Sequence, residues 1–390
     1  MHNVRCRRGD ITMIRRLTKK WRVLLIVFGL AVAACIAVGL IMYALAEEQM
    51  GGKADGARLE RMLVCPNFKE GKFVNALPTN MISPGQFIET GRMYLEASDR
   101  NPHKPIPTER IAAGFFAQAP VGGLRVTWLG HSAFIIELDG ALILTDPVLF
   151  SRASPFSWIG SERFFPCPVA MADLPEFDAV VISHDHYDHL AMDEVRALIP
   201  KTKKFIVALG IGAHLEHWGV PPEKIVELYW WEEAVIGNGV RVLAAPARHF
   251  SGRAFRRDPT LWASVMLIGP RHSVFFSGDS GMTPEFSEIG QRFGPFDCTL
   301  IKIGAYGRTW PDIHVTPEQA IEVHRLVRGN VFIPAHWATY NLAAHSWYEP
   351  VNRLLAAASG TDINLIVPKP GQPVVPDSSP PLVRWWDFLR

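Results

Sequence analysis

Short apolar runs bounded by turn residues mark out strands from residue 124 onward. The runs 124–129, 133–138 and 141–145 are separated by Gly130 and by Asp139-Gly140, a dipeptide that favours a hairpin. Similar runs predict further strands at 178–183, 204–209, 240–245, 263–269, 273–278, 297–303 and 330–335. The pattern therefore predicts hairpins first and then strands joined by longer connections.

Helical periodicity appears between the later strands. Helices are predicted at 192–198, 284–293, 317–327 and 347–358, several of them opened by Thr or Pro. Hairpins followed by alternating strands and helices predict an α/β (α+β) architecture, in which helices cover sheets in layers. No repeat of 20 to 50 residues is visible, which argues against a solenoid.

The chain divides by pattern into five segments. Gly51-Gly52 and the proline-rich stretch 101–107 indicate irregular backbone, with one helix expected over 84–98. We expect a basic N-terminus, an apolar segment, an extension that packs on the main domain, the main domain itself and a C-terminal tail. Their expected bounds are 1–22, 23–46, 47–123, 124–376 and 377–390.

The apolar segment 23–46 contains 24 residues without a charge. At ~1.5 Å per residue it would span a hydrocarbon core of ~30 Å. Eight Lys/Arg residues precede it, so the N-terminus is expected to stay cytoplasmic and the body to be exported to a bacterial periplasm or cell surface. An uncleaved anchor, a signal peptide cleaved after Ala44-Leu45-Ala46 and lipid attachment at Cys35 all remain open, and all three export the body.

Composition narrows the class of protein. The 390 residues are 48% hydrophobic and 20% charged, as in a globular protein. The net charge of +2 arises from the basic N-terminus, and no basic patch with interleaved aromatics indicates nucleic-acid binding. Only Cys65, Cys167 and Cys298 follow the apolar segment, so at most one disulfide is expected among them.

The stretch HDHYDH directly follows the apolar run 179–182 and contributes His184, His186, Asp188 and His189. Alternation in extended backbone puts His184 and His186 on one side. A helix starting near Asp188 would place the other two at its exposed N-terminus. Neutral imidazoles and carboxylates suit Zn(II), so the stretch predicts half of a two-metal site.

Three later residues follow predicted strands, where functional sites are usually built: His249 in PARHF, Asp279 in SGDSG and His336 in PAHW. Taken together with HDHYDH, they resemble the ordered motifs of the metallo-β-lactamase superfamily. Further motifs resemble its branch that contains N-acylphosphatidylethanolamine phospholipase D and bacterial relatives. These motifs are GLRVTWLGHSAF (123–134), LTDPVLFSRASP (144–155), WWEE (230–233), RFGPFD (292–297), IGAY (303–306) and HVTPEQA (314–320).

The resemblance covers about residues 72–371 and implies an αβ/βα four-layer sandwich, with a homodimer plausible. It also implies the ligand sets. One metal would be held by His184, His186 and His249, the other by Asp188, His189 and His336, and Asp279 would bridge them; Asp185 would not ligate. Two Zn(II) ions are expected, although such sites also accept iron, manganese or cobalt.

Two metals ~3.5–4 Å apart can hold a hydroxide and bind a phosphodiester oxygen. Asp279 and His314 are the expected catalytic residues, His314 by contacting phosphate or acting as a general acid. His131 and Asp146 are candidates for orienting the ligating rings. Four aromatic residues are expected either to line a substrate groove or to belong to the core: Tyr306, Trp230, Trp231 and Tyr340. Three arginines are expected either to contact anionic head groups or to form a solvated basic loop: Arg253, Arg256 and Arg257.

The sequence therefore favours a membrane-associated binuclear zinc phosphodiesterase. Its expected substrate is a phospholipid of the N-acylphosphatidylethanolamine type, cleaved in the phospholipase D manner by a metal-bridged hydroxide. Two alternatives stay open: a lactonase or other metal-dependent hydrolase, because one fold supports many substrates, and a tethered metal-binding protein without catalysis.

Overall fold

The computed structural model describes residues 8–81, 84–253, 256–376, 378 and 382–389. The chain forms two compact units that divide between Glu48 and Gln49. The first consists of most of helix α1 (Arg8–Met50), which contains the apolar segment 23–46. Over Lys19–Met50 this helix is long and apolar enough to cross a membrane, and most of its apolar side chains are exposed.

The second unit is built on two seven-stranded sheets. The first sheet contains, in spatial order, β10 (Ile225–Leu228), β9 (Thr202–Ala208), β8 (Phe177–Ile182), β5 (Ala141–Thr145), β4 (Ala133–Leu138), β3 (Leu124–Gly130) and β18 (Pro373–Val374). The second contains β11 (Glu233–Val235), β12 (Arg241–Ala245), β13 (Ser264–Ile268), β14 (Ser273–Phe276), β15 (Phe296–Lys302), β16 (Gly329–Ala335) and β17 (Asn364–Leu365). Two small ribbons, β1–β2 (Phe68–Lys69, Lys72–Phe73) and β6–β7 (Arg152–Ala153, Ser161–Glu162), complete the strands of the described residues.

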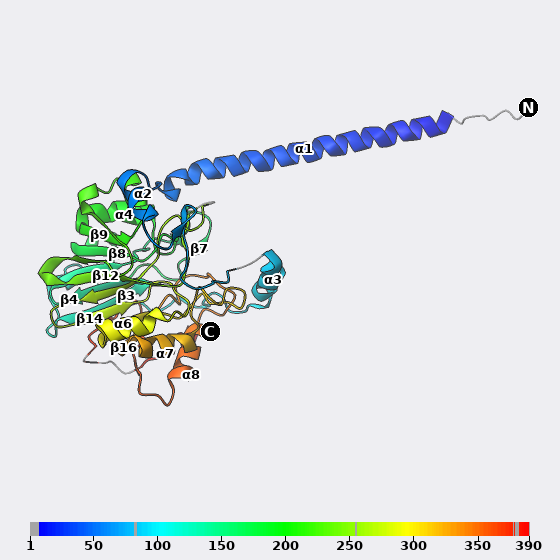
Figure 1. Cartoon of the computed structure of the whole chain (residues 1–390). Coiled ribbons are helices and arrows are strands. Elements are labelled where there is room, and N and C mark those ends of the chain that lie inside the picture. The colour runs from blue at the N-terminus through cyan, green and yellow to red at the C-terminus, as the bar shows by residue number, and fades with distance from the viewer. Residues whose placement is uncertain (1–7, 82–83, 254–255, 377, 379–381, 390) are drawn as a thin grey trace, which may run out of the picture. The chain divides into compact units, whose positions relative to one another are not determined.

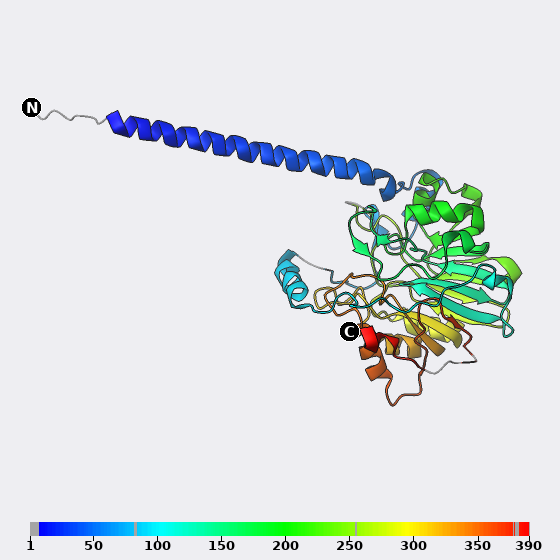
Figure 2. The same ribbon diagram turned by 180° about the vertical axis from the view of Figure 1, so that it is seen from behind.

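Helices cover the outer sides of the paired sheets (Figures 1 and 2). On the side of the first sheet lie α2 (Gly56–Leu63), α4 (Met192–Leu198) and α5 (Gly212–His217), and on the other side lie α6 (Glu285–Phe293), α7 (Pro317–Leu326) and α8 (Glu349–Ala358). The order helix, sheet, sheet, helix confirms the expected αβ/βα sandwich. A further helix, α3 (Phe87–Glu96), lies within the extension that precedes β3.

The core lies between the two sheets. Val181 and Ile206 of the first sheet and Val242 and Val265 of the second line the same small internal space, and all four are buried. Central strands such as β8 and β15 are buried along almost their whole length, because parallel strands with helices outside are covered on both faces. Each large apolar side chain buried in this way contributes ~1.5–3 kcal/mol.

Most predicted elements appear within two residues of their expected bounds. The hairpin at Asp139-Gly140 forms because both residues adopt positive φ, +49° and +87°. The predicted helix 84–98 is shorter, since α3 is preceded by a 3₁₀ turn. Helices α2 and α5 were not predicted. Neither were the short strands β1, β2, β6, β7, β10, β11, β17 and β18.

The expectation of a helix that starts near Asp188 was wrong. Residues 186–190 form a turn closed by the Leu190 N–H, which donates to the His186 carbonyl over 2.8 Å, and α4 begins only at Met192. The turn presents Asp188 and His189 toward the interior instead of at a helix N-terminus, which matters for the site below.

Candidate metal centre

Three imidazoles form the first cluster. His184 and His186 follow β8, and His249 follows β12 of the other sheet. His184 Nε2 lies 2.8 Å from His186 Nδ1, which lies 3.3 Å from His249 Nε2. The three nitrogens are close enough to share one cation.

The opposite nitrogens of two of these rings fix their protonation. His249 Nδ1 donates to the Ile313 carbonyl over 2.9 Å, because a carbonyl only accepts. The Ser183 hydroxyl donates to Asp146, so His184 Nδ1 donates to that hydroxyl oxygen over 2.9 Å. Both Nε2 atoms in the cluster therefore carry lone pairs, as metal ligation requires.

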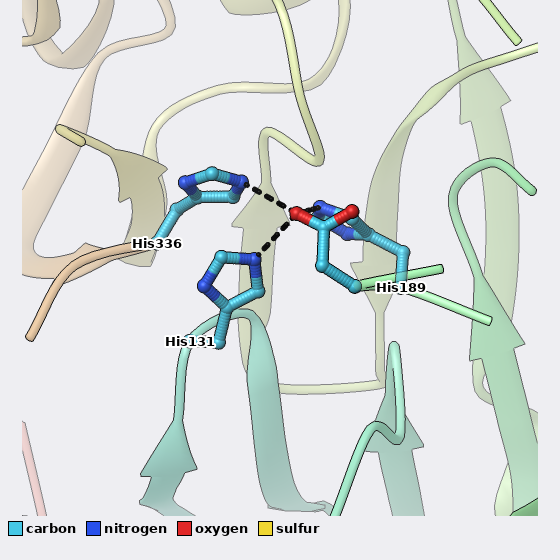
Figure 3. Close-up of side chains that lie close together, drawn as sticks. His131, His189 and His336 are labelled. Carbon is cyan, nitrogen blue, oxygen red and sulfur yellow. Dashed lines mark hydrogen bonds and ion pairs between the residues drawn. The ribbon is translucent and has the colours of Figure 1, made fainter. Parts of the chain in front are cut away.

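The second cluster surrounds the Asp188 carboxylate. In Figure 3 the rings of His131, His189 and His336 turn toward a single carboxylate. Asp188 Oδ2 lies 2.9 Å from His131 Nε2 and 3.4 Å from Nε2 of both His189 and His336. These four residues form a second group that could hold a metal.

Asp279 joins the two clusters. Its Oδ2 lies 3.1 Å from His336 Nε2, 3.6 Å from His189 Nε2 and 3.8 Å from His249 Nε2. Gly278 and Gly281 make this approach possible. A Cβ at Gly278, where φ is +52°, would lie 2.8 Å from Ser183 Cβ, and one at Gly281 would lie 1.8 Å from the Asp312 carbonyl oxygen.

The charge of the site fits a cation. Burial disfavours protonation of His189, yet the carboxylates of Asp188, Asp279 and Asp146 outweigh burial and raise its pKa well above the usual value. Several buried polar atoms at the centre also have no hydrogen-bonding partner among the described residues: His186 Nε2, His189 Nε2, Asp279 Oδ1 and both ring nitrogens of His336. Buried polar atoms are normally paired, so these suit ligation by a metal.

The two residues expected to orient the ligands lie directly behind them. Asp146 Oδ2 accepts from His189 Nδ1 over 2.7 Å, and His131 Nε2 contacts Asp188 as described above. His131, Asp146 and His336 all have positive φ, +54°, +33° and +61°. Residues other than glycine rarely adopt this conformation, and such strain gathers at functional sites.

The prediction of a solvated basic loop was wrong for Arg253. Its side chain is 4% exposed, and Nη1 donates to the carbonyls of Asp185 (2.8 Å) and Leu190 (2.6 Å). It thereby clamps both ends of the HDHYDH turn. Arg256 and Arg257 are exposed, as that reading supposed.

Asp185 points away from both clusters. It accepts from the Gly252 N–H over 2.7 Å and the Thr260 hydroxyl over 2.9 Å, and it belongs to none of the groups that could hold a metal among the described residues. Its role is to tie the turn to the loop after His249.

A cavity of about 390 Å³ opens beside the two clusters. His186, Asp188, Asp279, His314 and His336 form its polar floor. Its walls are mostly apolar, with Arg257 and Thr90 as polar exceptions, and comprise Met81, Tyr94, Phe250, Ala305, Trp310, Ile313 and Leu342.

The aromatic candidates do not line this cavity. Tyr306 lines a neighbouring cavity that shares His314, and its hydroxyl donates to Glu349 over 2.7 Å. Trp230 is buried and donates to the Trp262 carbonyl, and Tyr340 is buried beside Arg163. Sequence reasoning missed Trp310 and Phe250, although Phe250 directly follows His249.

Comparison with known proteins identifies the family of this chain. Residues 142–337 match the family model of the beta-lactamase superfamily domain, which covers half of the chain and includes both clusters except His131. The chain belongs to the metallo-β-lactamase superfamily. Within this superfamily it is a metal-dependent hydrolase, as the matching relatives and its His/Asp clusters indicate.

Two relatives and one solved structure illustrate the similarity. An uncharacterized Mycobacterium tuberculosis protein is 45% identical over 328 residues, 82% of this chain and 87% of the relative. N-acyl-phosphatidylethanolamine-hydrolyzing phospholipase D 1 of Caenorhabditis elegans is 35% identical over 280 residues, 68% of this chain and 78% of the relative. A metallo hydrolase of Ignicoccus hospitalis shares the fold, with a TM-score of 0.50 at 23% identity over 64% of this chain and 97% of that one.

Proposed function

We propose that the protein is a membrane-associated phosphodiesterase that hydrolyses phospholipids of the N-acylphosphatidylethanolamine type at the bond cleaved by a phospholipase D. The observation that carries this proposal is the largely apolar cavity that ends on the two clusters. A small polar substrate such as a simple lactone would leave that apolar wall uncovered. The similarity to the Caenorhabditis elegans phospholipase D supports the same substrate class.

In this proposal His184, His186 and His249 would hold one Zn(II), Asp188, His189 and His336 would hold a second, and Asp279 would be a ligand to both. When bound, such a pair of ions supplies Lewis-acid activation of water and charge stabilisation at the phosphoryl group. The Nε2 atoms of His184, His249 and His189 face the centre, because the opposite nitrogens donate to Ser183, Ile313 and Asp146.

Different residues of the cavity are placed to contact different parts of the substrate. The Arg257 guanidinium lies 4.7 Å above the Phe250 ring at the cavity wall, where it can pair with a phosphate. His314 lies on the floor, beside Asp279, and is placed to donate to a phosphoryl or leaving-group oxygen. Trp310, Ile313 and Leu342 offer contact to acyl chains.

The long apolar helix α1 supports a location at a membrane, with the body exported. A lipid substrate lies in the plane to which such an anchor tethers the enzyme, and tethering raises the local concentration of both partners.

The test uses the full chain reconstituted in phospholipid vesicles that contain an N-acylphosphatidylethanolamine. We expect release of N-acylethanolamine, abolished by a chelator and restored by Zn(II), together with about two zinc ions per chain. Lactones and water-soluble phosphodiesters are assayed in parallel. Lactone hydrolysis without lipid hydrolysis would replace the substrate class, and less than one metal per chain with no hydrolysis of any substrate would refute the enzyme itself.

A further inference from the structure

One buried lysine lies beside the proposed catalytic histidine. Lys302 is the last residue of β15, and its side chain is completely buried. Lysines are almost never fully buried unless they are paired. The contacts of the Lys302 side chain therefore explain how a charged residue can lie buried at the end of this strand.

Two contacts hold the ammonium group. Nζ donates to the Gly304 carbonyl over 2.8 Å, and it contacts His314 Nδ1. The backbone N–H of Lys302 donates to the Ser277 hydroxyl, which anchors the end of the strand next to the loop that carries Asp279. The side chain is thus fixed at both ends.

The contact with His314 determines which ring nitrogen carries the proton. An ammonium has three donors and no acceptor, so a hydrogen bond between Lys302 and His314 requires a lone pair on Nδ1. In the neutral ring the proton then lies on Nε2, the nitrogen left for a ligand in the cavity.

A competing neighbour favours the other tautomer. Asp279 Oδ2 lies 3.7 Å from the same His314 Nδ1 and would attract a proton there. That separation exceeds hydrogen-bonding distance, whereas Lys302 is in direct contact. Without Lys302, the Asp279 carboxylate would favour a proton on His314 Nδ1.

We propose that Lys302 is a positioning residue, which holds His314 in the tautomer that donates from Nε2 to a phosphoryl or leaving-group oxygen of the substrate. This role deepens the phosphodiesterase function proposed above and rests on it. Burial lowers the pKa of Lys302 to about 8, which leaves it charged at neutral pH.

The experiment replaces the ammonium with an apolar group of similar length, in Lys302→Met, and uses the full chain loaded with Zn(II). On the lipid substrate we expect kcat to fall about 10- to 100-fold with KM changed less than twofold, since a positioned donor acts mainly in the transition state. Lys203→Met is the matched control, because Lys203 is an exposed lysine paired with Asp178 at the surface.

A double-mutant cycle with His314→Gln separates positioning from a general structural role. If Lys302 acts through His314, Lys302→Met adds no further loss in the His314→Gln background. Thermal unfolding and zinc content should stay close to wild type in Lys302→Met, because replacing a buried charge by a well-packed apolar group is often neutral or stabilising. Additive losses of kcat would overturn the proposal.

A spectroscopic readout tests the tautomer without any activity. Nitrogen NMR of histidine-labelled protein, with His314 assigned by its loss in His314→Gln, should show a protonated Nε2 in the wild type and a shift toward protonated Nδ1 in Lys302→Met. An unchanged His314 signal would refute the inference even if the enzyme is active. Failure of the proposed function would instead appear as no phosphodiester hydrolysis by the wild type, whatever the NMR result.

Discussion

His189 donates a hydrogen bond through Nδ1 to Asp146 Oδ2 over 2.7 Å, and both side chains are completely buried. Asp146 also accepts from the Ser183 N–H at Oδ1 and from the Ser183 hydroxyl at Oδ2. Three donors therefore converge on one carboxylate, which holds the His189 ring with its Nε2 toward the centre.

Asp146→Asn should weaken metal binding. An amide cannot accept three hydrogen bonds without turning its NH₂ group toward a donor, so the His189 ring loses its support. We expect zinc affinity and hydrolysis to fall about 10- to 100-fold, measured by competition with a chromophoric chelator and by product release. The exposed Asp362→Asn serves as the control and should behave as wild type. Unchanged zinc affinity would show that His189 is oriented by other contacts.

Arg253→Met should destabilise the fold around the metal site. The Arg253 side chain donates to the carbonyls of Asp185, Leu190 and Gln49, which would be left without this partner. We expect a loss of about 2–4 kcal/mol in the free energy of unfolding and a lower zinc content, measured by denaturant titration and elemental analysis. Arg256→Met, three residues away at an exposed position, should change neither. Equal stability of the two variants would contradict the clamp.

Glu194 should make stability depend on pH. Burial raises the pKa of its carboxyl from 4.5 to about 7 in the folded protein. Between pH 4.5 and 7 the unfolded chain ionises first, so this group lowers folding stability as pH rises through that window, by on the order of 3 kcal/mol, and adds nothing further above it. Glu194 Oε1 accepts from the N–H groups of Leu149 and Phe150, which a glutamine oxygen can also do.

Glu194→Gln should therefore gain stability relative to the wild type as the pH rises from 4.5 to 8. The quantity to compare is the difference between the two unfolding temperatures at each pH, because other groups titrate equally in both proteins. A constant difference across this range would mean that Glu194 is already ionised in the folded state at pH 5.

Leu342→Asp should lower the preference for long acyl chains. Leu342 lines the apolar wall of the cavity, and a carboxylate there would be desolvated by an acyl chain. We expect kcat/KM for a long-chain N-acylphosphatidylethanolamine to fall at least about 10-fold while hydrolysis of a water-soluble phosphodiester changes little. Val235→Asp, at an exposed strand position, is the control. Equal losses on both substrates would place the acyl chains elsewhere.

The fold was largely accessible from sequence because local signals agree with the tertiary structure. Strands β4 and β5 and helix α4 have the predicted bounds, since alternation, a hairpin dipeptide and helical spacing each act over a few residues. Short edge elements escaped prediction. β11 has only three residues, and its place at the edge of the second sheet depends on pairing with β12.

The side chains of the two clusters that could hold a metal were predictable in identity, but the residues that position them were not all predictable. The HDHYDH stretch indicated His184, and positions directly after predicted strands, together with the family resemblance, indicated His249 and Asp279. The burial of Arg253 and the contact between Lys302 and His314 depend on segments that meet only in the folded chain. The basic run that contains Arg253 resembles a surface loop in sequence, and only its position behind the HDHYDH turn buries it.

Both sheets contribute residues to the candidate metal site, so the site can form only late in folding. His184 and His186 follow a strand of the first sheet, whereas His249, Asp279 and His336 follow strands of the second. Neither proposed ligand set can be complete in a growing chain until the two sheets have met, and the set of Asp188, His189 and His336 also waits until residue 336 has emerged. For a chain that crosses a membrane before it folds, the ions available outside the cytoplasm would then determine which metal it carries.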